Sequence, residues 1–398
     1  MLQIADRMKT LGTETAFEVL ARANALAAQG KSIINLGIGQ PDFATPGHIV
    51  EAGRKALADG HHGYTPANGI LPLREAVAAD LVRRHGVEVS PADVLVVPGG
   101  KVTMFFSIMI FGEPGAEIMY PNPGFPIYES VIRFSGATPV PMPLYEAAGF
   151  SFNAEEVLSK ITPRTRLIIV NSPANPTGGV VPRAELDKLV RGLSDHPQVA
   201  VMSDEIYGEI LYDGHEHFSL LRYPELRDRL ILLDGWSKTY AMTGWRLGYG
   251  VWPKTLFPLA EKLAINCHSC VNAATQFAGI AALQGPREPV ERMVRAFAER
   301  REFIVKALNT LPGMRCVNPG GAFYTFPQVA GTGYDAKTLQ TALLEEAGVA
   351  TIAGTSFGAF GEDYIRISYA NSMEALAEAV ERIRRFLGNL PHRQASIA

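Results

Sequence analysis

Short apolar runs alternate with amphipathic segments through the middle of the chain. Several runs are apolar at consecutive positions, as a strand covered on both faces requires. They lie at residues 93–97, 117–120, 167–170, 199–202, 229–233 and 246–251. Between them, the segment after Pro182 carries leucines and a valine at helical spacing. This alternation predicts an α/β fold, with a mostly parallel sheet and crossover helices on its faces.

The pattern changes near Pro286, where a long charged helical segment begins. The elements expected from there on are that helix, running to Leu311, short strands near 322–326 and 364–369, and a last helix after Asn371. Such a mixture of isolated strands and helices is typical of a smaller α+β domain.

We therefore predict two domains. The large domain spans residues 46–288, and the small domain combines residues 1–45 with residues 289–398. A helix expected near residues 14–29 packs with the small domain or reaches across to a neighbouring subunit. A chain of 398 residues is long enough to bury the cores of two such domains.

The charge balance argues against nucleic acid and against an anionic membrane surface as partners. The formal net charge is −3, and no block of like charges occurs. The longest apolar run, residues 102–111, falls short of the roughly 20 residues that span a bilayer. The N-terminus carries Asp6, Glu14 and Glu18 and no apolar signal region, which predicts a cytoplasmic protein that acts on small molecules.

Cys267, Cys270 and Cys316 form no even disulfide framework, which fits a reducing compartment. Cys267 and Cys270 have C-x-x-C spacing, but a structural zinc site needs four ligands and no second pair exists. We expect no metal site, and the role of these two cysteines stays open.

Lys238 is the first candidate for chemistry. It follows an apolar strand within the segment from Asp234 to Tyr249, which is rich in Ser, Thr and Gly. Burial there would remove water from the amine and make it a nucleophile able to form a Schiff base. Taken alone, however, a lysine at a strand end is more often a surface residue.

The segment resembles the cofactor-lysine motif of the class I/II aminotransferases, the fold type I group of aspartate, alanine and aromatic aminotransferases. The resemblance implies that Lys238 holds pyridoxal 5′-phosphate (PLP) as a Schiff base. It also implies that Arg246, eight residues later, binds the cofactor phosphate and that Ser237 adds a contact. Family members often have a phosphate-binding serine where this chain has Gly235.

Further motifs follow in the order of that family. Residues 171–178 resemble the loop that places an asparagine, here Asn175, on the 3′-oxygen of the cofactor. Residues 203–207 resemble the element that sets Asp204 against the pyridine nitrogen and Tyr207 on the 3′-oxygen.

Three more segments extend the resemblance at the cofactor. Glycines that open a helix expose N–H groups to a phosphate, and the candidates here are Gly100, Lys101 and Val102. Phe125 occupies the position of the ring that stacks on the pyridine. Tyr64 matches a tyrosine that reaches the cofactor phosphate of the other subunit, which implies a homodimer with active sites shared between subunits.

The resemblance also places the substrate. Gly39 lies in the segment that approaches the substrate carboxylate, and Asn175 is a second candidate for substrate binding. Arg366 matches the arginine that binds this carboxylate. A guanidinium offers a planar, bidentate match to a carboxylate, which suits arginine better than lysine.

The implied activity is an aminotransferase that moves the amino group of an L-amino acid to a 2-oxo acid through a PLP/pyridoxamine phosphate ping-pong cycle. Lys238 would act as base and acid, with Asp204 and Tyr207 tuning the cofactor. The implied fold has a seven-stranded, mostly parallel sheet flanked by helices and a smaller α+β domain. A PLP-dependent β-lyase, or other carbanion chemistry on the same fold, stays open as the alternative.

The amino donor is not readable from these motifs. Aspartate-specific relatives bring a second arginine from the partner subunit, and none is evident in residues 264–272, which argues against strict aspartate specificity. Phe17 and residues 13–16 are candidates for the side-chain pocket and favour neutral or aromatic donors.

One rival motif is G-x-S-x-G at residues 354–358, the nucleophile elbow of α/β-hydrolases. That elbow belongs between a strand and a helix of the main sheet, whereas only one strand and one helix are expected after this point. We therefore reject the hydrolase reading.

Overall fold

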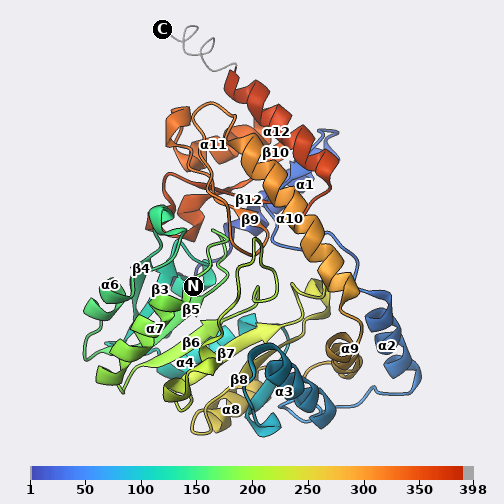
Figure 1. The fold of residues 1–398 in the computed structure, drawn as a ribbon, viewed down its shortest axis with the longest axis vertical. Coiled ribbons are helices and arrows are strands. Elements are labelled where there is room, and N and C mark those ends of the chain that lie inside the picture. Colours follow the sequence, from blue (N-terminus) through green and yellow to red (C-terminus); the bar gives the residue numbers. More distant parts are fainter. Residues whose placement is uncertain (1, 389–398) are drawn as a thin grey trace.

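The computed structural model describes residues 2–388, and its lower part in Figure 1 is built on a seven-stranded sheet. The strand order is β2-β8-β7-β6-β5-β3-β4, and only β8 runs antiparallel to its neighbours. The strands are β2 (Val94–Val97), β3 (Glu117–Asn122), β4 (Thr138–Pro143), β5 (Thr165–Asn171), β6 (Ala200–Asp204), β7 (Leu230–Gly235) and β8 (Gly248–Val251). The predicted α/β fold class is confirmed.

Strand β4 was absent from the expected elements, and its composition explains why. Pro139, Pro141 and Pro143 interrupt its apolar pattern. Proline has no N–H to donate to a ladder and is tolerated in a sheet mainly at its edge. Strand β4 is the edge strand and pairs only with β3.

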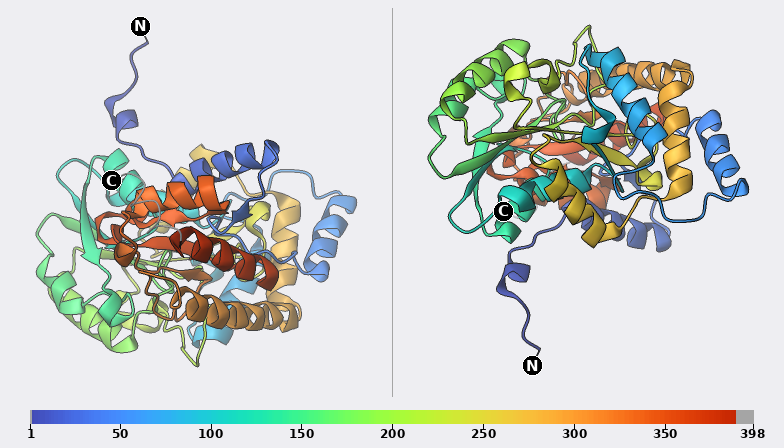
Figure 2. Two further views of the ribbon diagram at one scale, coloured as in Figure 1. Left: turned by 90° about the horizontal axis from the view of Figure 1, so that it is seen from above. Right: turned by 90° about the horizontal axis from the view of Figure 1, so that it is seen from below.

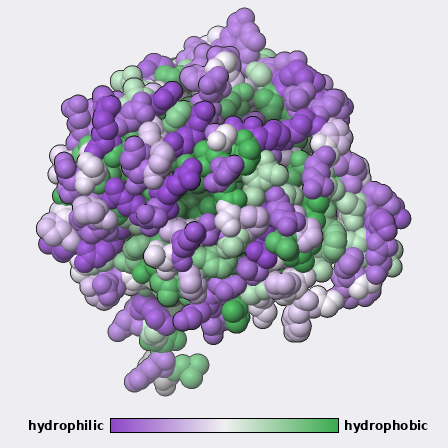
Figure 3. Space-filling model, turned by 60° about the horizontal axis from the view of Figure 1, so that its bottom comes forward, coloured by the Kyte–Doolittle hydropathy of each residue, from purple (hydrophilic) through white to green (hydrophobic). Residues whose placement is uncertain are grey.

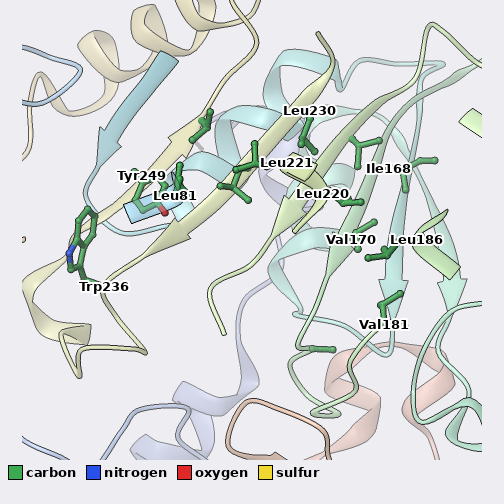
Figure 4. Close-up of a cluster of buried hydrophobic side chains, with 14 of the residues drawn as sticks. Leu81, Ile168, Val170, Val181, Leu186, Leu220, Leu221, Leu230, Trp236 and Tyr249 are labelled. Carbon is green, nitrogen blue, oxygen red and sulfur yellow. The ribbon is translucent and has the colours of Figure 1, made fainter. Parts of the chain in front are cut away.

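Helices cover both faces of this sheet, so alternate residues of one strand enter different cores. In β5, Ile168 and Val170 pack in the cluster that also holds Leu186 and Leu221 (Figure 4). Leu167 and Ile169, which alternate with them along the strand, enter the opposite cluster. Burial on both faces is the physical reason for the consecutive apolar positions in the sequence.

The helices expected near residues 14–29, after Pro182, from Pro286 and after Asn371 are all present, together with others for which no helical spacing was identified. They are α1 (Thr15–Ala28), α2 (Gly47–Ala58), α3 (Leu71–His85), α4 (Lys101–Phe111), α5 (Ile127–Ser135), α6 (Ala154–Ser159), α7 (Arg183–Gly192), α8 (Phe257–His268), α9 (Ala273–Gln284), α10 (Glu288–Leu308), α11 (Ala336–Ala342) and α12 (Met373–Gly388). Among the described residues, none of the helices combines the length and the apolar character needed to cross a bilayer.

The upper part of the molecule in Figure 1 holds α10, α11, α12 and two small sheets. Strands β11 (Ile352–Ala353), β12 (Ile365–Ser368) and β9 (Tyr324–Thr325) form one sheet, and β1 (Ile34–Asn35) pairs in parallel with β10 (Val349–Ala350) in the other. A separate apolar cluster fills this part. The pairing of β1 with β10 supports the assignment of residues 1–45 to the small domain, whose exact limits stay a prediction.

The first residues extend away from the body of the molecule (Figure 2), whereas Thr10 and Gly12, nearer to α1, form hydrogen bonds with residues of α5. Leu2 and Ile4 are strongly exposed there. Helix α1 itself contacts β10 and β11 of the small domain, and Val19, Ala23 and Leu26 are its buried residues.

Candidate active site

The candidate site lies at the carboxyl ends of the parallel strands, where open α/β sheets bind their ligands. Strands β5, β6 and β7 end at Asn171, Asp204 and Gly235, side by side in the sheet. Gly235 pairs with Gly248 of β8, so Lys238 and Arg246 emerge at the same edge although β8 runs the other way. The sheet register thereby brings the two cations together.

A cavity of about 520 Å³ opens at this edge. The residues predicted from the sequence that line it are Gly39, Gly100, Lys101, Phe125, Asn175, Asp204, Tyr207, Ser237, Lys238, Arg246 and Arg366. Tyr64 and Val102 do not line it. The N–H of Val102 donates instead to the carbonyl of Gly99 at 3.1 Å, within the first turn of α4.

The amine of Lys238 lies inside the cavity. Its Nζ donates a hydrogen bond of 2.6 Å to the carbonyl oxygen of Gly39. Burial lowers the pKa of Lys238 to about 8, and the positive charges of Arg366, Arg246 and Lys101 act in the same direction. A large fraction of this lysine is therefore neutral, and nucleophilic, at mildly alkaline pH.

Asp204 is buried at the end of β6. Its Oδ2 accepts a 2.6 Å hydrogen bond from the hydroxyl of Tyr128, and its Oδ1 accepts one of 3.3 Å from the N–H of Ile206. Burial raises the pKa of Asp204 to about 6, while both hydrogen bonds oppose the shift. A cationic partner in the cavity would favour the ionised form of this carboxyl.

Tyr207 and Tyr324 form a buried pair whose hydroxyl oxygens lie 2.7 Å apart. Burial raises the pKa of Tyr207 well above its usual range, so its hydroxyl keeps its proton and can donate. Tyr324 also explains the glycine at position 39, because a Cβ there would overlap its hydroxyl.

One end of the cavity is suited to an anion. The guanidinium of Arg246 packs against Gly99, where a side chain would overlap it and where φ is +93°. Helix α4 begins at Lys101, so the positive end of its dipole faces the same place. Ser237 is buried and lines the same cavity as the start of α4.

The structure gives a reason for Gly235 in place of the serine found in many family members. A Cβ at this position would lie 2.8 Å from the Cα of Gly248 on the paired strand. Strands β7 and β8 therefore leave no room for a side chain at position 235, and the hydroxyl-bearing residues of this segment that line the cavity are Ser237 and Thr243.

Arg366 is almost fully buried on β12 and also lines the cavity. Its Nη1 donates to Oδ1 of Asn175 at 2.9 Å, and its Nη2 donates to the carbonyl of Gly37 at 2.5 Å. Its Nε is buried and has no acceptor among the described residues. A buried, unsatisfied guanidinium N–H is a donor suited to a ligand carboxylate.

A buried ionic network supports the loop that carries Lys238. Asp234, at the start of that segment, accepts a 2.8 Å hydrogen bond from Arg84 and one of 3.2 Å from Tyr249. Arg84 also binds Asp80 at 2.7 Å. Sequence reasoning did not identify Arg84 or Asp80, because the network joins α3 to β7 across distant parts of the chain.

Three residues of the site were also missed: Tyr128 and Tyr324, which bind Asp204 and Tyr207, and Gly37, whose carbonyl binds Arg366. An aromatic residue in an apolar segment carries no sign that its hydroxyl meets a polar group. Glu14 falls within residues 13–16, the stretch predicted for the side-chain pocket, and it lines the cavity, but no local pattern indicated which side chain it would meet.

The donor set fits PLP. An amine with a lowered pKa, a buried carboxyl and a phenol face one cavity, and a guanidinium with a helix start lies at its other end. In PLP the amine matches the aldehyde, the carboxyl matches the ring nitrogen and the phenol matches the phenolic oxygen. The guanidinium and the helix start match the phosphate.

Comparison with known proteins agrees with this geometry. Residues 31–383 match the family described as aminotransferase class I and II. The aspartate aminotransferase of Geobacillus stearothermophilus is 38% identical over 97% of this chain and 99% of its own length.

Solved structures of aminotransferases are also similar to this chain. The aspartate aminotransferase of Rhizobium meliloti superposes with a TM-score of 0.93, at 34% identity over 98% of this chain and 99% of that one. The aromatic aminotransferase of Pyrococcus horikoshii superposes with a TM-score of 0.88, at 36% identity, over 93% of this chain and 99% of its own. These relatives are named as aminotransferases and give no support to the lyase alternative. The chain therefore belongs to the class I and II aminotransferases of fold type I, and it is a PLP-dependent enzyme that transfers amino groups between amino acids and 2-oxo acids.

Proposed function

We propose that Lys238 is the amine that holds the cofactor and moves the substrate proton, and that Arg366 binds the substrate α-carboxylate. The observation that carries this proposal is that the two side chains face one cavity from different parts of the fold. When bound, PLP supplies the electron sink that stabilises negative charge at the substrate Cα. The remaining chemistry is that of the chain itself.

Lys238 is suited to proton transfer because its pKa of about 8 lies near physiological pH. With PLP and an amino acid bound, its neutral amine would take the proton from the substrate Cα and could return it at C4′ of the cofactor. Its hydrogen bond to Gly39 supports this role, because Gly39 belongs to the loop that we assign to the substrate carboxylate.

Asp204, Tyr207 and Asn175 are assigned to the cofactor ring. Asp204 in its ionised form holds a proton on the ring nitrogen, and the hydroxyl of Tyr128 favours that ionised form. The carbonyl oxygen of Asn175 is engaged by Arg366, which leaves the amide N–H₂ to donate to the 3′-oxygen. Tyr207 is the second donor to this oxygen.

Phosphate binding is assigned to Arg246, Ser237 and the start of α4 at Gly100 and Lys101. Phe125 is assigned to stacking on the ring, and it lines the same cavity. Because the phosphate and α-carboxylate sites use different guanidinium groups, substitutions at each should separate cofactor binding from substrate binding.

The pKa of Lys238 gives a prediction for the apoprotein. Only the unprotonated amine attacks an aldehyde, so the rate of PLP incorporation should rise as pH increases through about 8 and then level off. Stopped-flow absorbance between pH 6 and 10 measures this profile. Lys238→Arg should show no incorporation, and a wild-type rate that does not change with pH would contradict the assignment.

The transamination itself is tested with the PLP-loaded protein. Each common amino acid is mixed with it in the absence of an oxo acid, and conversion of the cofactor to pyridoxamine phosphate is followed by absorbance. Formation of one equivalent of 2-oxo acid per site supports the proposal. Release of ammonia, or loss of the substrate side chain, would indicate elimination chemistry instead.

A homodimer is part of the proposal. Tyr64 is 93% exposed, as expected of a side chain that completes the site of another subunit. Apolar surface gathers near the centre of the face shown in Figure 3, with polar residues around it.

We also propose a cytoplasmic location, which is compatible with the free state of all three cysteines.

Tyr64→Phe should weaken PLP binding by about tenfold, because it removes one hydrogen bond to a charged group, and should leave the dimer intact. Equilibrium titration of the apoprotein measures the affinity, and sedimentation measures the mass. Tyr145→Phe is a matched control, because Tyr145 is also exposed and does not line the cavity. A monomeric protein with full activity would refute the shared site.

A further inference from the structure

Glu14 occupies the N-cap position of α1 but does not cap the helix. Its side chain makes no hydrogen bond to the N–H groups of the first turn. The carboxylate instead forms an ion pair with the Nζ of Lys101, which lies 87 positions away in sequence at the start of α4. A side chain that would normally stabilise its own helix is thus directed into the cavity.

Lys101 is the fourth cation of the cavity, beside Lys238, Arg246 and Arg366. The side chains of the other three have assigned partners in the cofactor or in the substrate α-carboxylate, whereas Lys101 is assigned to the phosphate through its backbone N–H at the start of α4, which leaves its ammonium for another partner. Its Nζ lies 5.3 Å from the ring centre of Phe125, the residue assigned to the cofactor ring. A free ammonium at this place would attract a second carboxylate on a substrate side chain.

The negative charge of Glu14 acts electrostatically on other residues of the cavity. Burial lowers the pKa of both Lys238 and Arg366, and the negative charge of Glu14 acts against this shift at each of them. Ala16 and Phe17, which follow Glu14 on α1, line the same wall of the cavity. This wall therefore presents apolar surface and a neutralised ion pair to a substrate.

We propose, on the basis of the substrate-binding roles given above, that Glu14 determines specificity by taking the place of a second substrate carboxylate. It neutralises Lys101 and repels a carboxylate brought near, so aspartate and glutamate are disfavoured as donors. Amino acids with uncharged side chains, including aromatic ones, are the substrate class, because they pack against Phe17 and Phe125 without meeting an uncompensated charge. Exclusion by a repulsive element is a common route to specificity.

The proposal is tested by the half-reaction of the PLP-loaded enzyme with single amino acids, which needs no oxo acid. Wild type should react with phenylalanine at a higher kcat/KM than with aspartate. Glu14→Gln should raise the aspartate-to-phenylalanine ratio by about tenfold or more, because it removes one negative charge beside Lys101. Glu14→Asp keeps the charge and should keep the wild-type preference.

Two variants serve as matched controls. Glu18→Gln removes the same charge from an exposed position of α1 and should not alter the ratio. The double variant Glu14→Gln/Lys101→Gln should lose the gain in aspartate reactivity, because the freed cation is then absent. Thermal unfolding of each variant checks that the fold is retained.

Equilibrium binding of unreactive acids provides a second measurement. Wild type should bind 3-phenylpropionate more tightly than succinate, and Glu14→Gln should tighten succinate binding by about tenfold. A wild-type preference for aspartate, or a folded Glu14→Gln protein with unchanged ratios in both measurements, would overturn the role of Glu14. If no amino acid reacts while the binding preference changes as stated, the proposed roles in transamination fail and the role of Glu14 stands.

Discussion

Lys238→Ala is expected to lower kcat by about 10⁴-fold or more, the largest effect of any single substitution in this chain. The change removes both the nucleophile that holds the cofactor and the base that moves the substrate proton, and general acid–base catalysis alone contributes about 10²–10⁴-fold. Single-turnover absorbance with the amino acid that reacts fastest with wild type measures the loss. The cavity should keep its affinity for the phosphate end of the cofactor, since Arg246 and Ser237 are unchanged.

Two observations sharpen this test. Borohydride reduction of the wild-type protein followed by peptide mass spectrometry should find the cofactor mass on Lys238, and reduction of the variant should find it on no lysine. Lys238→Arg keeps the positive charge but cannot form the bond, so it should be as inactive as the alanine variant. A near-normal rate in either variant, or labelling of a different lysine in wild type, would rule out the assignment.

Arg366→Ala is expected to lower kcat/KM for amino acids by about 10²-fold or more. Two charge-assisted hydrogen bonds to the α-carboxylate are worth about 3 kcal/mol or more together, and 1.4 kcal/mol corresponds to a factor of ten. Most of the loss should appear in KM, because this carboxylate is bound throughout the reaction. Steady-state kinetics with the preferred donor measures it.

The effect should depend on the substrate having a carboxylate. With phenylethylamine, which lacks that group, Arg366→Ala should react at a rate close to the low wild-type rate, whereas with phenylalanine it should be strongly impaired. Arg366→Lys should recover only part of the loss, because an ammonium cannot reproduce the planar, two-point contact. Weakened PLP binding with unchanged KM would instead assign Arg366 to the cofactor.

Much of the fold could be read from the chain because its strands are buried on both faces. The six expected strands of the main sheet all formed, with ends shifted by a few residues. Elements of two residues, such as β1 and β10, could not be predicted, because two positions cannot display a period. The edge strand β4 was hidden by its prolines.

The sequence by itself determined the chemistry of the cofactor site. Lys238 and Arg246 stand at a fixed spacing across a short turn. Asp204 ends strand β6 and Asn175 lies in the loop after β5, so local order was enough to place them at one sheet edge. The family resemblance supplied the roles proposed for them.

Only the tertiary structure decided which side chains meet from distant segments. It paired Glu14 with Lys101, Tyr207 with Tyr324 and Arg366 with Asn175, across separations of 87, 117 and 191 positions. Such contacts depend on strand order and on how the two parts of the molecule pack, and neither property is encoded in a local pattern. Activity of this class could therefore be predicted from the chain alone, whereas the substrate preference depends on a pairing that only folding creates.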